Sequence, residues 1–435
     1  MNAPPKPKVH WVSPLPPAET DIAHYTARIL PELADRCDLT LWTDAKTWNK
    51  DLEAYCKVRH LDPDLVCPAD FAHAGQGPDG PNAIFIHIGN SWVFHSGLLR
   101  LARRIPSIIV LHDLAIQEML FDSILNNLFP IDSYVSAMAQ WYGPRGRLLA
   151  TDVLKRNVRP LDIAKEAPGF EIALDRAAAV VTHTPAAYDA AVTKGGLPVY
   201  LLDLPFRPSL YTPPAQRPDN GPLQLMQFGY IGPNRRLTQV LEALAPLRDK
   251  IPFQFDIMGN VWDPSLVMRR IDELGLTERV KIHGFVPEPQ LDTQLAAAHL
   301  VFNLRYPTMG EASGSQLRIW NASAASVVTD HGWYGSLPDE TVFKVPLDRE
   351  APALRDLLHR IAADRSHCAR IGSAGRARLE ARHTPARYAD GIVHVAAQIV
   401  PNAIAALKAR VARAMLARNV GSRKLVAETL ARRCL

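Results

Sequence analysis

The chain has 435 residues, of which 47% are hydrophobic and 21% charged, and its 49 Lys and Arg against 44 Asp and Glu leave a formal net charge of +5. At about 150 residues per domain this length predicts two or three domains. The composition excludes a mostly disordered chain, a collagen-like repeat and a small disulfide scaffold, and the slight positive excess does not indicate a nucleic-acid-binding protein.

The first half of the chain alternates short apolar segments with helix-like segments. The predicted strands are Lys8 to Val12, Leu39 to Trp42, Ala83 to Ile88, Ser107 to Leu111 and Ala178 to Thr182. A helix is predicted over Asp21 to Cys37, and a helical excursion over the sheet between Ala115 and Lys165. Continuous apolar strands that alternate with helices are typical of an α/β protein with a parallel sheet.

A proline-rich stretch from Leu204 to Pro222 predicts a semi-stiff linker, because it cannot form a ladder or a helix. Beyond it the alternation resumes. The predicted strands are Leu223 to Gly229, Phe253 to Met258, Val280 to His283, His299 to Leu304 and Ser326 to Asp330. The predicted helices are Arg236 to Leu247, Leu266 to Leu274, Glu288 to Ala298, Gln316 to Ala325, Leu354 to Arg382 and Arg387 to Ile399.

These elements predict two wound parallel sheets with a helical tail. We expect an N-terminal Rossmann-like domain over 1–205, a linker over 206–222, a second Rossmann-like domain over 223–385 and C-terminal helices over 386–435. Ligands of wound sheets bind at the carboxyl ends of the strands. A cleft between the two sheets is therefore the expected ligand site.

The two ends of the chain and its cysteines indicate in which cellular compartment the protein is expected. Residues 403–435 carry eight Lys or Arg against the single acid Glu428, which fits either a solvated pair of surface helices or a helix on an anionic membrane surface. The five cysteines are scattered without a Cys-x-x-Cys pair, and no signal peptide or membrane-spanning run is evident. We expect a cytoplasmic protein, either free or peripheral at the inner face of the membrane.

The first constellation is the segment from Phe228 to Arg236, which lies between a predicted strand and a predicted helix. Gly229 and Gly232 allow a tight turn, and Asn234 is the expected N-cap. Arg235 and Arg236 add two positive charges at the helix N-terminus, where a diphosphate binds well. The alternative is a capped helix with two surface arginines.

The second constellation is the segment from Asn303 to Ser315, again between a predicted strand and a helix. The Glu311 carboxylate can accept hydrogen bonds from sugar hydroxyls, while Ser313, Gly314 and Ser315 offer backbone N–H groups to an anion. This pairing fits a sugar phosphate. Capping of the following helix by Glu311 is the alternative.

The third constellation consists of histidines at or just beyond strand ends in the first sheet. His87, His95 and His112 could donate to substrate hydroxyls or to a leaving phosphate, since the histidine pKa is easily placed near neutrality. A purely structural histidine is the alternative, favoured for His87 and His95. No Walker-type loop and no His-Glu-x-x-His motif is present, and we predict no metal site.

Taken together, these segments resemble the retaining glycosyltransferases of family 4, in their bacterial polysaccharide branch, over roughly residues 8 to 400. The resemblance rests on the ordered set Ser13-Pro-Leu-Pro-Pro17, Ala23-His-Tyr25, Gly89-Asn90 with His95, Leu111-His112-Asp113, Gly229 to Arg236, Asn303 to Ser315 and Val327 to Trp333. It implies the GT-B fold and transfer of a hexose-type sugar from a GDP- or UDP-linked donor to a glycan or lipid-linked acceptor. Neither a metal nor another cofactor is implied.

The resemblance also implies roles for individual residues. His112 and Glu311 would contact the transferred sugar as the catalytic pair. The donor-binding residues would be Gly232, Asn234, Arg235, Arg236, Gly259, Ser313, Gly314 and Ser315. Asn90, His95 and Asp113 would line the cleft or the acceptor site.

The chain departs from the family pattern at one acidic position. Arg318 stands where many members carry a second glutamate, and Trp320 and Asn321 replace small residues in the following helix. Two alternatives to transfer therefore stay open: a GT-B protein that binds a nucleotide or glycan without transferring, and a sugar-nucleotide epimerase, which would need more carboxylates than the sequence offers.

Overall fold

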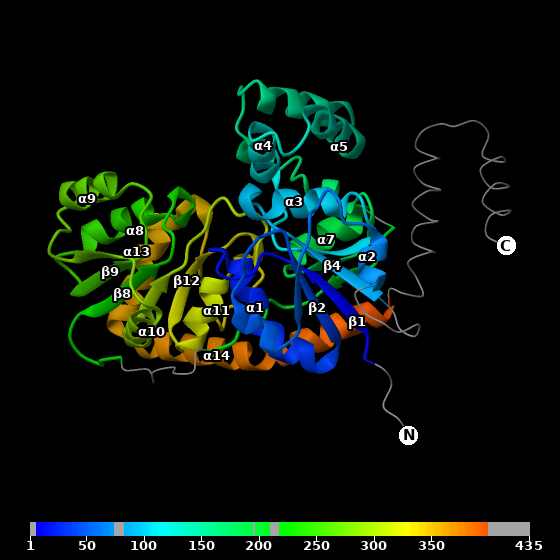
Figure 1. Ribbon diagram of the computed structural model, residues 1–435. Helices are drawn as coiled ribbons and strands as arrows, with labels where there is room; N and C mark the ends of the chain where they lie inside the picture. The colour runs from blue at the N-terminus through cyan, green and yellow to red at the C-terminus, as the bar shows by residue number, and fades with distance from the viewer. Residues whose placement is uncertain (1–5, 74–81, 195, 209–216, 399–435) are drawn as a thin grey trace. The chain divides into compact units, whose positions relative to one another are not determined.

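The computed structural model describes residues 6–73, 82–194, 196–208 and 217–398, which form two compact units. The first unit comprises the described residues up to Leu202 and those from Tyr388 onward, and the second comprises Asp203–Arg387. Each unit contains one parallel sheet with helices packed on it (Figure 1). The expected fold of two Rossmann-like wound sheets is confirmed.

The sheet of the first unit has seven strands in the order β3-β2-β1-β4-β5-β6-β7. Its strands are β1 (Lys8–Val12), β2 (Asp38–Thr43), β3 (Lys57–His60), β4 (Asn82–Ile88), β5 (Ser107–Leu111), β6 (Ala177–Thr182) and β7 (Val199–Leu201). All neighbouring strands pair in parallel. The central strands β1, β4 and β5 are almost wholly buried, which explains their continuous apolar sequences.

Helices cover this sheet and form the predicted excursion. They are α1 (Asp21–Arg36), α2 (Pro68–His73), α3 (Trp92–Ala102), α4 (Gln117–Leu125), α5 (Ile131–Leu154), α6 (Pro160–Ile163) and α7 (Pro185–Lys194). Figure 1 shows α4 and α5 as a helical layer beyond α3. The helix α5 bends at Gly143, whose φ of 65° is not helical and which precedes Pro144. Tyr134 and Met138 anchor this layer in the core.

The sheet of the second unit has six strands in the order β10-β9-β8-β11-β12-β13. Its strands are β8 (Leu223–Phe228), β9 (Phe253–Met258), β10 (Val280–Gly284), β11 (Leu300–Phe302), β12 (Ala325–Thr329) and β13 (Phe343–Val345). Its helices are α8 (Leu237–Leu244), α9 (Pro264–Glu273), α10 (Glu288–Ala297), α11 (Gly314–Asn321), α12 (Gly332–Gly335), α13 (Glu350–Ala363) and α14 (Ser366–Arg382). The strand order reverses between β8 and β11, so this is the expected ligand edge.

One predicted helix is corrected, and not every strand was predicted. The single helix predicted over Leu354 to Arg382 is two helices, because Asp364 is extended and its Oδ1 accepts a hydrogen bond from the backbone N–H of Ser366. The strand β3 was not predicted, since it is mostly exposed and lacks a continuous apolar run.

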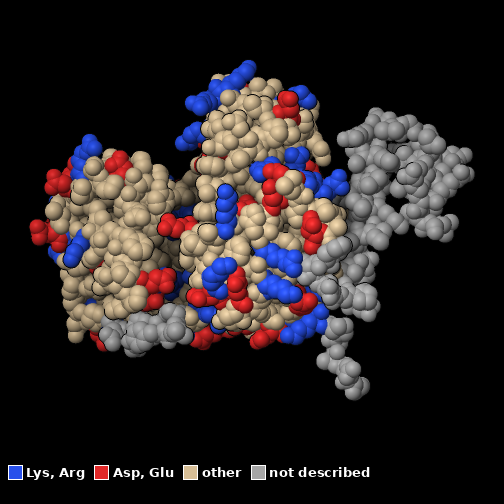
Figure 2. All heavy atoms as spheres, viewed as in Figure 1, with Lys and Arg blue, Asp and Glu red and all other residues tan. Residues whose placement is uncertain are grey.

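The chain also carries a helix over 385–398, most of which belongs to the first unit. Tyr388, Ile392 and Val395 are buried there. None of the helices in the described ranges is long and apolar enough to cross a membrane. Figure 2 shows Lys and Arg interspersed with Asp and Glu over the visible face, as the near-balanced composition predicts. The basic tail at 403–435 lies outside the described residues.

Candidate donor site and histidine cluster

In the second unit, the loop after β8 brings Arg235 over a glycine. Gly229 has a φ of 98°, and a Cβ placed on it would lie 3.5 Å from Arg235 Nη2. The Gln227 amide Nε2 donates to the Arg235 carbonyl at 2.8 Å and so fixes the loop from below. The guanidinium of Arg235 therefore lies at the carboxyl end of β8.

A chain of hydrogen bonds joins this loop to the end of β11. Arg235 Nη1 donates to Asn303 Oδ1 at 3.1 Å, and Asn303 Nδ2 donates to Gln316 Oε1 at 2.9 Å. Gln316 Nε2 in turn donates to Ser326 Oγ on β12 at 2.8 Å. A buried network whose members are satisfied orders its side chains. The position of Arg235 is thus set by Asn303 at the end of β11, which Gln316 of α11 holds in turn.

Glu311 lies in the loop between β11 and α11. Its Oε2 accepts a hydrogen bond from the backbone N–H of Met309 at 2.6 Å, and its Oε1 lies 3.4 Å from Arg305 Nη1. The backbone N–H of Tyr306 donates to the Asn234 carbonyl at 2.8 Å, which ties this loop to the one that carries Arg235. Glu311 therefore does not cap α11, and the structure brings its loop beside that of Arg235.

Arg236 is held differently from its neighbour. Its Nε and Nη2 both donate to Glu350 Oε2, at 2.9 and 2.6 Å, and the Glu350 side chain is only 3% exposed. Arg236 adopts the left-handed conformation at the start of α8. The sequence predicted that the Arg236 charge binds a diphosphate, but in the structure this charge is paired with the buried Glu350 carboxylate.

Three further residues predicted to bind the donor are Gly232, Asn234 and Gly259, which shape the loops after β8 and β9. The predicted N-cap role of Asn234 is wrong: Asn234 lies in a single 3₁₀ turn with Gly232 before it, and α8 begins after Arg236. A Cβ on Gly259, whose φ is 126°, would lie 2.0 Å from the Gly229 carbonyl oxygen. Only glycine therefore lets the loops after β8 and β9 lie this close.

The start of α11 offers backbone donors near Glu311. Ser313 is the N-cap, and its Oγ accepts a hydrogen bond from the backbone N–H of Gln316 at 3.1 Å. A Cβ on Gly314 would meet nothing within 4 Å, so the helix start is open there. Together with Ser315, these residues place the positive end of a helix dipole at the same sheet edge.

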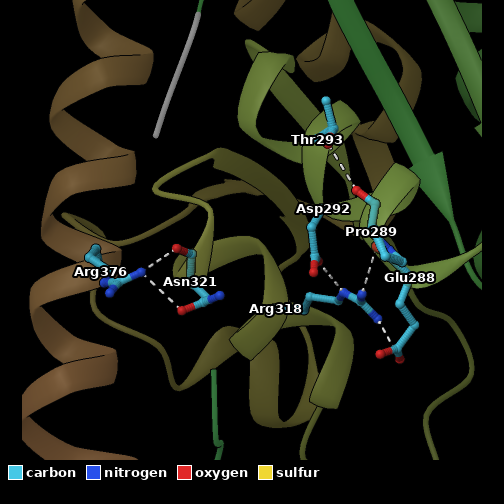
Figure 3. Close-up of polar contacts among 7 residues, drawn as sticks. All are labelled: Glu288, Pro289, Asp292, Thr293, Arg318, Asn321 and Arg376. Atoms are coloured by element: carbon cyan, nitrogen blue, oxygen red, sulfur yellow. Dashed lines mark hydrogen bonds and ion pairs between the residues drawn. The ribbon is translucent and has the colours of Figure 1, made fainter. Parts of the chain in front are cut away.

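Arg318, the departure from the family pattern, is engaged by α10 (Figure 3). Its Nε donates to Asp292 Oδ1 at 2.8 Å, and its Nη1 lies 3.2 Å from Glu288 Oε1. Two carboxylates therefore offset its charge.

The neighbouring substitutions also serve packing. Trp320 is fully buried, and a Cβ on Gly375 of α14 would lie 2.1 Å from its ring. Asn321 accepts a hydrogen bond from Arg376 of α14 at 2.9 Å, also drawn in Figure 3. These side chains join α11 to α14.

In the first unit, the loops after β4 and β5 are joined by Asn90 and Asp113. The backbone N–H of Asn90 donates to Asp113 Oδ2 at 2.8 Å. The Asn90 side chain accepts from the backbone N–H of Met119 at 3.0 Å and donates to Glu118 Oε2 at 3.0 Å. Asn90, whose backbone is held by Asp113, thus ties the start of α4 to the end of β4.

His112 follows β5 directly and belongs to a cluster of rings. Its ring centroid lies 5.1 Å from that of Tyr25, 5.1 Å from that of His87 and 5.0 Å from that of His183. Tyr388, from the helix over 385–398, closes the cluster by a hydrogen bond with the Tyr25 hydroxyl. The roles of His183 and Tyr388 were not predicted, although His183 follows β6 in the way that His112 follows β5.

Burial controls the charge of these histidines. It lowers the pKa of His87 and of His112 well below the ordinary value, and neighbouring histidines lower both further. Burial lowers the pKa of His95 to about 4, against the opposing effect of the hydrogen bond between His95 Nδ1 and the His87 carbonyl. At neutral pH these rings are therefore uncharged and can both donate and accept hydrogen bonds.

The structure thus groups the predicted residues within each unit. Arg235, Glu311 and the Ser313–Ser315 segment lie at one sheet edge of the second unit, and His112 with Asn90 and Asp113 at one edge of the first. His95 is buried behind the β4 loop. Among the described residues, no group of three or more His, Cys, Asp or Glu side chains is placed to hold a metal ion.

Comparisons with known proteins give a family match over part of the chain and a set of similar folds. Residues 235–394 match the family model described as glycosyl transferase-like. No curated protein sequence matches the chain closely enough to count as a relative.

Several solved structures share the fold. Sucrose-phosphate synthase from Thermosynechococcus elongatus is 16% identical with a TM-score of 0.61, over 91% of this chain and 99% of that one. HepE from Anabaena, solved with UDP and glucose, is 15% identical with a TM-score of 0.58, over 90% and 99%. The lipopolysaccharide outer core galactosyltransferase WaaB is 11% identical with a TM-score of 0.51, over 91% and 99%.

Proposed function

We propose that this chain is a group 1 glycosyltransferase with the GT-B fold, and that it transfers a hexose from a nucleotide-diphosphate donor to a glycan or lipid-linked acceptor with retention of configuration. The placement of Arg235 and Glu311 on joined loops, where the strand order reverses between β8 and β11, carries this proposal. Biosynthesis of a cell-surface polysaccharide is the process we assign to it.

The donor diphosphate would bind between Arg235 and the start of α11. A guanidinium forms charge-assisted hydrogen bonds with phosphate oxygens, and the open backbone at Gly314 leaves room for them to approach. We assign Arg236 to anchoring α8, because Glu350 already offsets its charge. HepE was solved with UDP and with UDP-glucose, which supports uridine over guanosine as the base.

We assign Glu311 of the second unit and His112 of the first unit to hydrogen bonds with hydroxyls of the transferred sugar. The Glu311 carboxylate can accept hydrogen bonds from sugar hydroxyls, and its contact with Arg305 orients it. His112 offers a neutral ring to another hydroxyl. These contacts orient the anomeric carbon toward the acceptor, which is the main contribution of a site without a protein nucleophile.

The reaction breaks the bond between the anomeric carbon and the phosphate oxygen and forms a bond from that carbon to the acceptor oxygen. The acceptor attacks on the face that the phosphate leaves, and its hydroxyl proton passes to the departing phosphate oxygen. Arg235 and the dipole of α11 stabilise the negative charge that develops on the diphosphate.

A panel of nucleotides tests the donor assignment. Ligand that binds the native state raises the melting temperature by mass action. We expect UDP and UDP-hexoses to stabilise the protein more than GDP, ADP or free sugars. Stabilisation by none of the nucleoside diphosphates would overturn the assignment.

Replacement of Glu311 separates transfer from mere binding. We expect Glu311→Gln to abolish most donor turnover while the nucleoside diphosphate still binds, because the sugar contact alone is lost. Glu278→Gln changes an exposed glutamate and should have no effect. Absence of donor turnover in the unmodified protein, together with intact nucleotide binding, would favour a binding protein.

A further inference from the structure

His87 is a buried side chain that the proposed mechanism leaves unused. It lies in β4 with no exposed surface, and its Nδ1 is 2.8 Å from His112 Nε2. We propose that His87 is a positioning residue, which binds His112 Nε2 so that His112 Nδ1 is the atom presented to the transferred sugar. The inference rests on the proposed role of His112.

The hydrogen bonds of His112 define which of its nitrogens is available. Nε2 is engaged with His87, whichever of the two rings donates the shared proton. Within the described ranges, no second side chain hydrogen-bonds the His112 ring, which is partly exposed. Nδ1 is therefore the polar atom that remains for a substrate hydroxyl.

Neighbouring rings restrict rotation of His112. The Tyr25 ring meets it edge-on at an interplanar angle of 84°, and the His183 ring lies at 49° on a centroid distance of 5.0 Å. The Tyr25 hydroxyl is in turn held by Tyr388. Rotation that exchanged the two nitrogens would break the bond to His87 among closely packed rings.

His87 is itself held firmly. Its ring lies 4.3 Å from the fully buried Trp11 ring, and its strand is paired in parallel on both sides. Within the described part of the chain, His87 Nε2 has no hydrogen-bond partner. A buried polar atom without a hydrogen bond costs folding free energy. A histidine at position 87 despite this cost at Nε2 indicates that the ring serves through Nδ1, which bonds to His112.

Two amide substitutions of His87 distinguish its two nitrogens. Asn places its amide close to the position of Nδ1, whereas Gln reaches toward that of Nε2. We expect His87→Asn to keep kcat within about threefold of the unmodified enzyme and His87→Gln to lower kcat roughly tenfold, the effect of one lost neutral hydrogen bond. The KM for the donor should change little if the diphosphate supplies most of the affinity.

His10 provides the matched control. It is 2% exposed in the neighbouring strand β1, where it bonds to Asn82 at 2.6 Å and to Trp42 at 3.1 Å. His10→Gln should lower the melting temperature without changing the kcat of the folded enzyme. Equal losses of kcat in His87→Asn and His87→Gln, or no loss in His87→Gln, would overturn the proposal.

A second readout does not depend on turnover. With ¹⁵N-labelled histidine, we expect His112 to show one tautomer in the unmodified protein and in His87→Asn, and a mixture in His87→Gln. The same His112 tautomer pattern in His87→Asn and His87→Gln would overturn the positioning role by itself. If donor turnover is absent while His112 keeps a single tautomer, the proposed function fails and the positioning of the ring stands.

Discussion

Replacement of Arg236 by alanine is expected to destabilise the second unit while leaving nucleotide binding nearly intact. The substitution leaves the Glu350 carboxylate without its partner, although its side chain is only 3% exposed. Removing one member of a buried ion pair costs about 3–5 kcal/mol, and the 22% exposure of the Arg236 side chain places this case near about 3 kcal/mol.

This cost corresponds to a measurable change in melting temperature. The second unit spans Asp203–Arg387, and for a domain of that size each kcal/mol lowers the melting temperature by roughly 2–4 °C. We therefore expect its calorimetric transition to fall by roughly 6–12 °C. The double variant Arg236→Met with Glu350→Leu should recover much of the loss, because an apolar pair of similar volume is often at least as stable.

Arg235→Ala is the contrasting variant. It removes a hydrogen bond to Asn303 and should change the melting temperature little, but it should weaken UDP binding by roughly tenfold or more through loss of a charged hydrogen bond. Isothermal titration calorimetry at a temperature where all variants are folded measures this. An unchanged melting temperature of Arg236→Ala, or a loss of UDP affinity as large as that of Arg235→Ala, would show that Arg236 is not a structural partner of Glu350.

Four further outcomes are expected. Gly259→Ala should severely destabilise the second unit, because the added Cβ would lie 2.0 Å from the Gly229 carbonyl oxygen. Gly314→Ala should leave the urea denaturation midpoint unchanged, because its added Cβ would meet no atom within 4 Å. Lowering the pH from 7.5 to 5 should lower the unfolding free energy of the first unit by about 2 kcal/mol through His95 alone. The reason is that the unfolded side chain takes up a proton near pH 6.5 and the folded one only near its pKa of about 4. His95→Gln should reduce this pH dependence of the unfolding free energy by the same amount, and an unchanged pH dependence would show that burial does not lower the His95 pKa. Arg318→Gln should lower the melting temperature but keep UDP affinity within about threefold, since its guanidinium bonds to α10; a larger loss of affinity would place it in the site. Donor turnover should persist in EDTA, and its loss would show that a divalent ion takes part.

The sequence predicted the architecture well, because the strands of both sheets that are buried on two faces have continuous apolar runs. The exceptions were strands such as β3, whose burial is slight and whose pairing depends on the neighbouring strand. The division of α13 from α14 depends on one extended residue at Asp364, which no hydrophobic period marks.

The placement of the candidate residues at one sheet edge was predictable, but the ion pairs among their side chains were not. Polar residues after β8 and β11 marked the sheet edge, as expected for a wound sheet. The difference between Arg235 and Arg236 could not be predicted, because Glu350 lies far along the chain and only the packing of α8 on α13 brings it close. The pairing of His87 with His112 likewise depends on the register of β4 and β5.

A structure of the protein with bound UDP would show directly where the donor diphosphate binds. We expect a diphosphate at the carboxyl ends of β8 and β11, with the Arg235 guanidinium about 2.7–3.2 Å from phosphate oxygens and the start of α11 beside them. UDP bound at another place, or Arg235 turned away from the phosphates, would contradict this expectation.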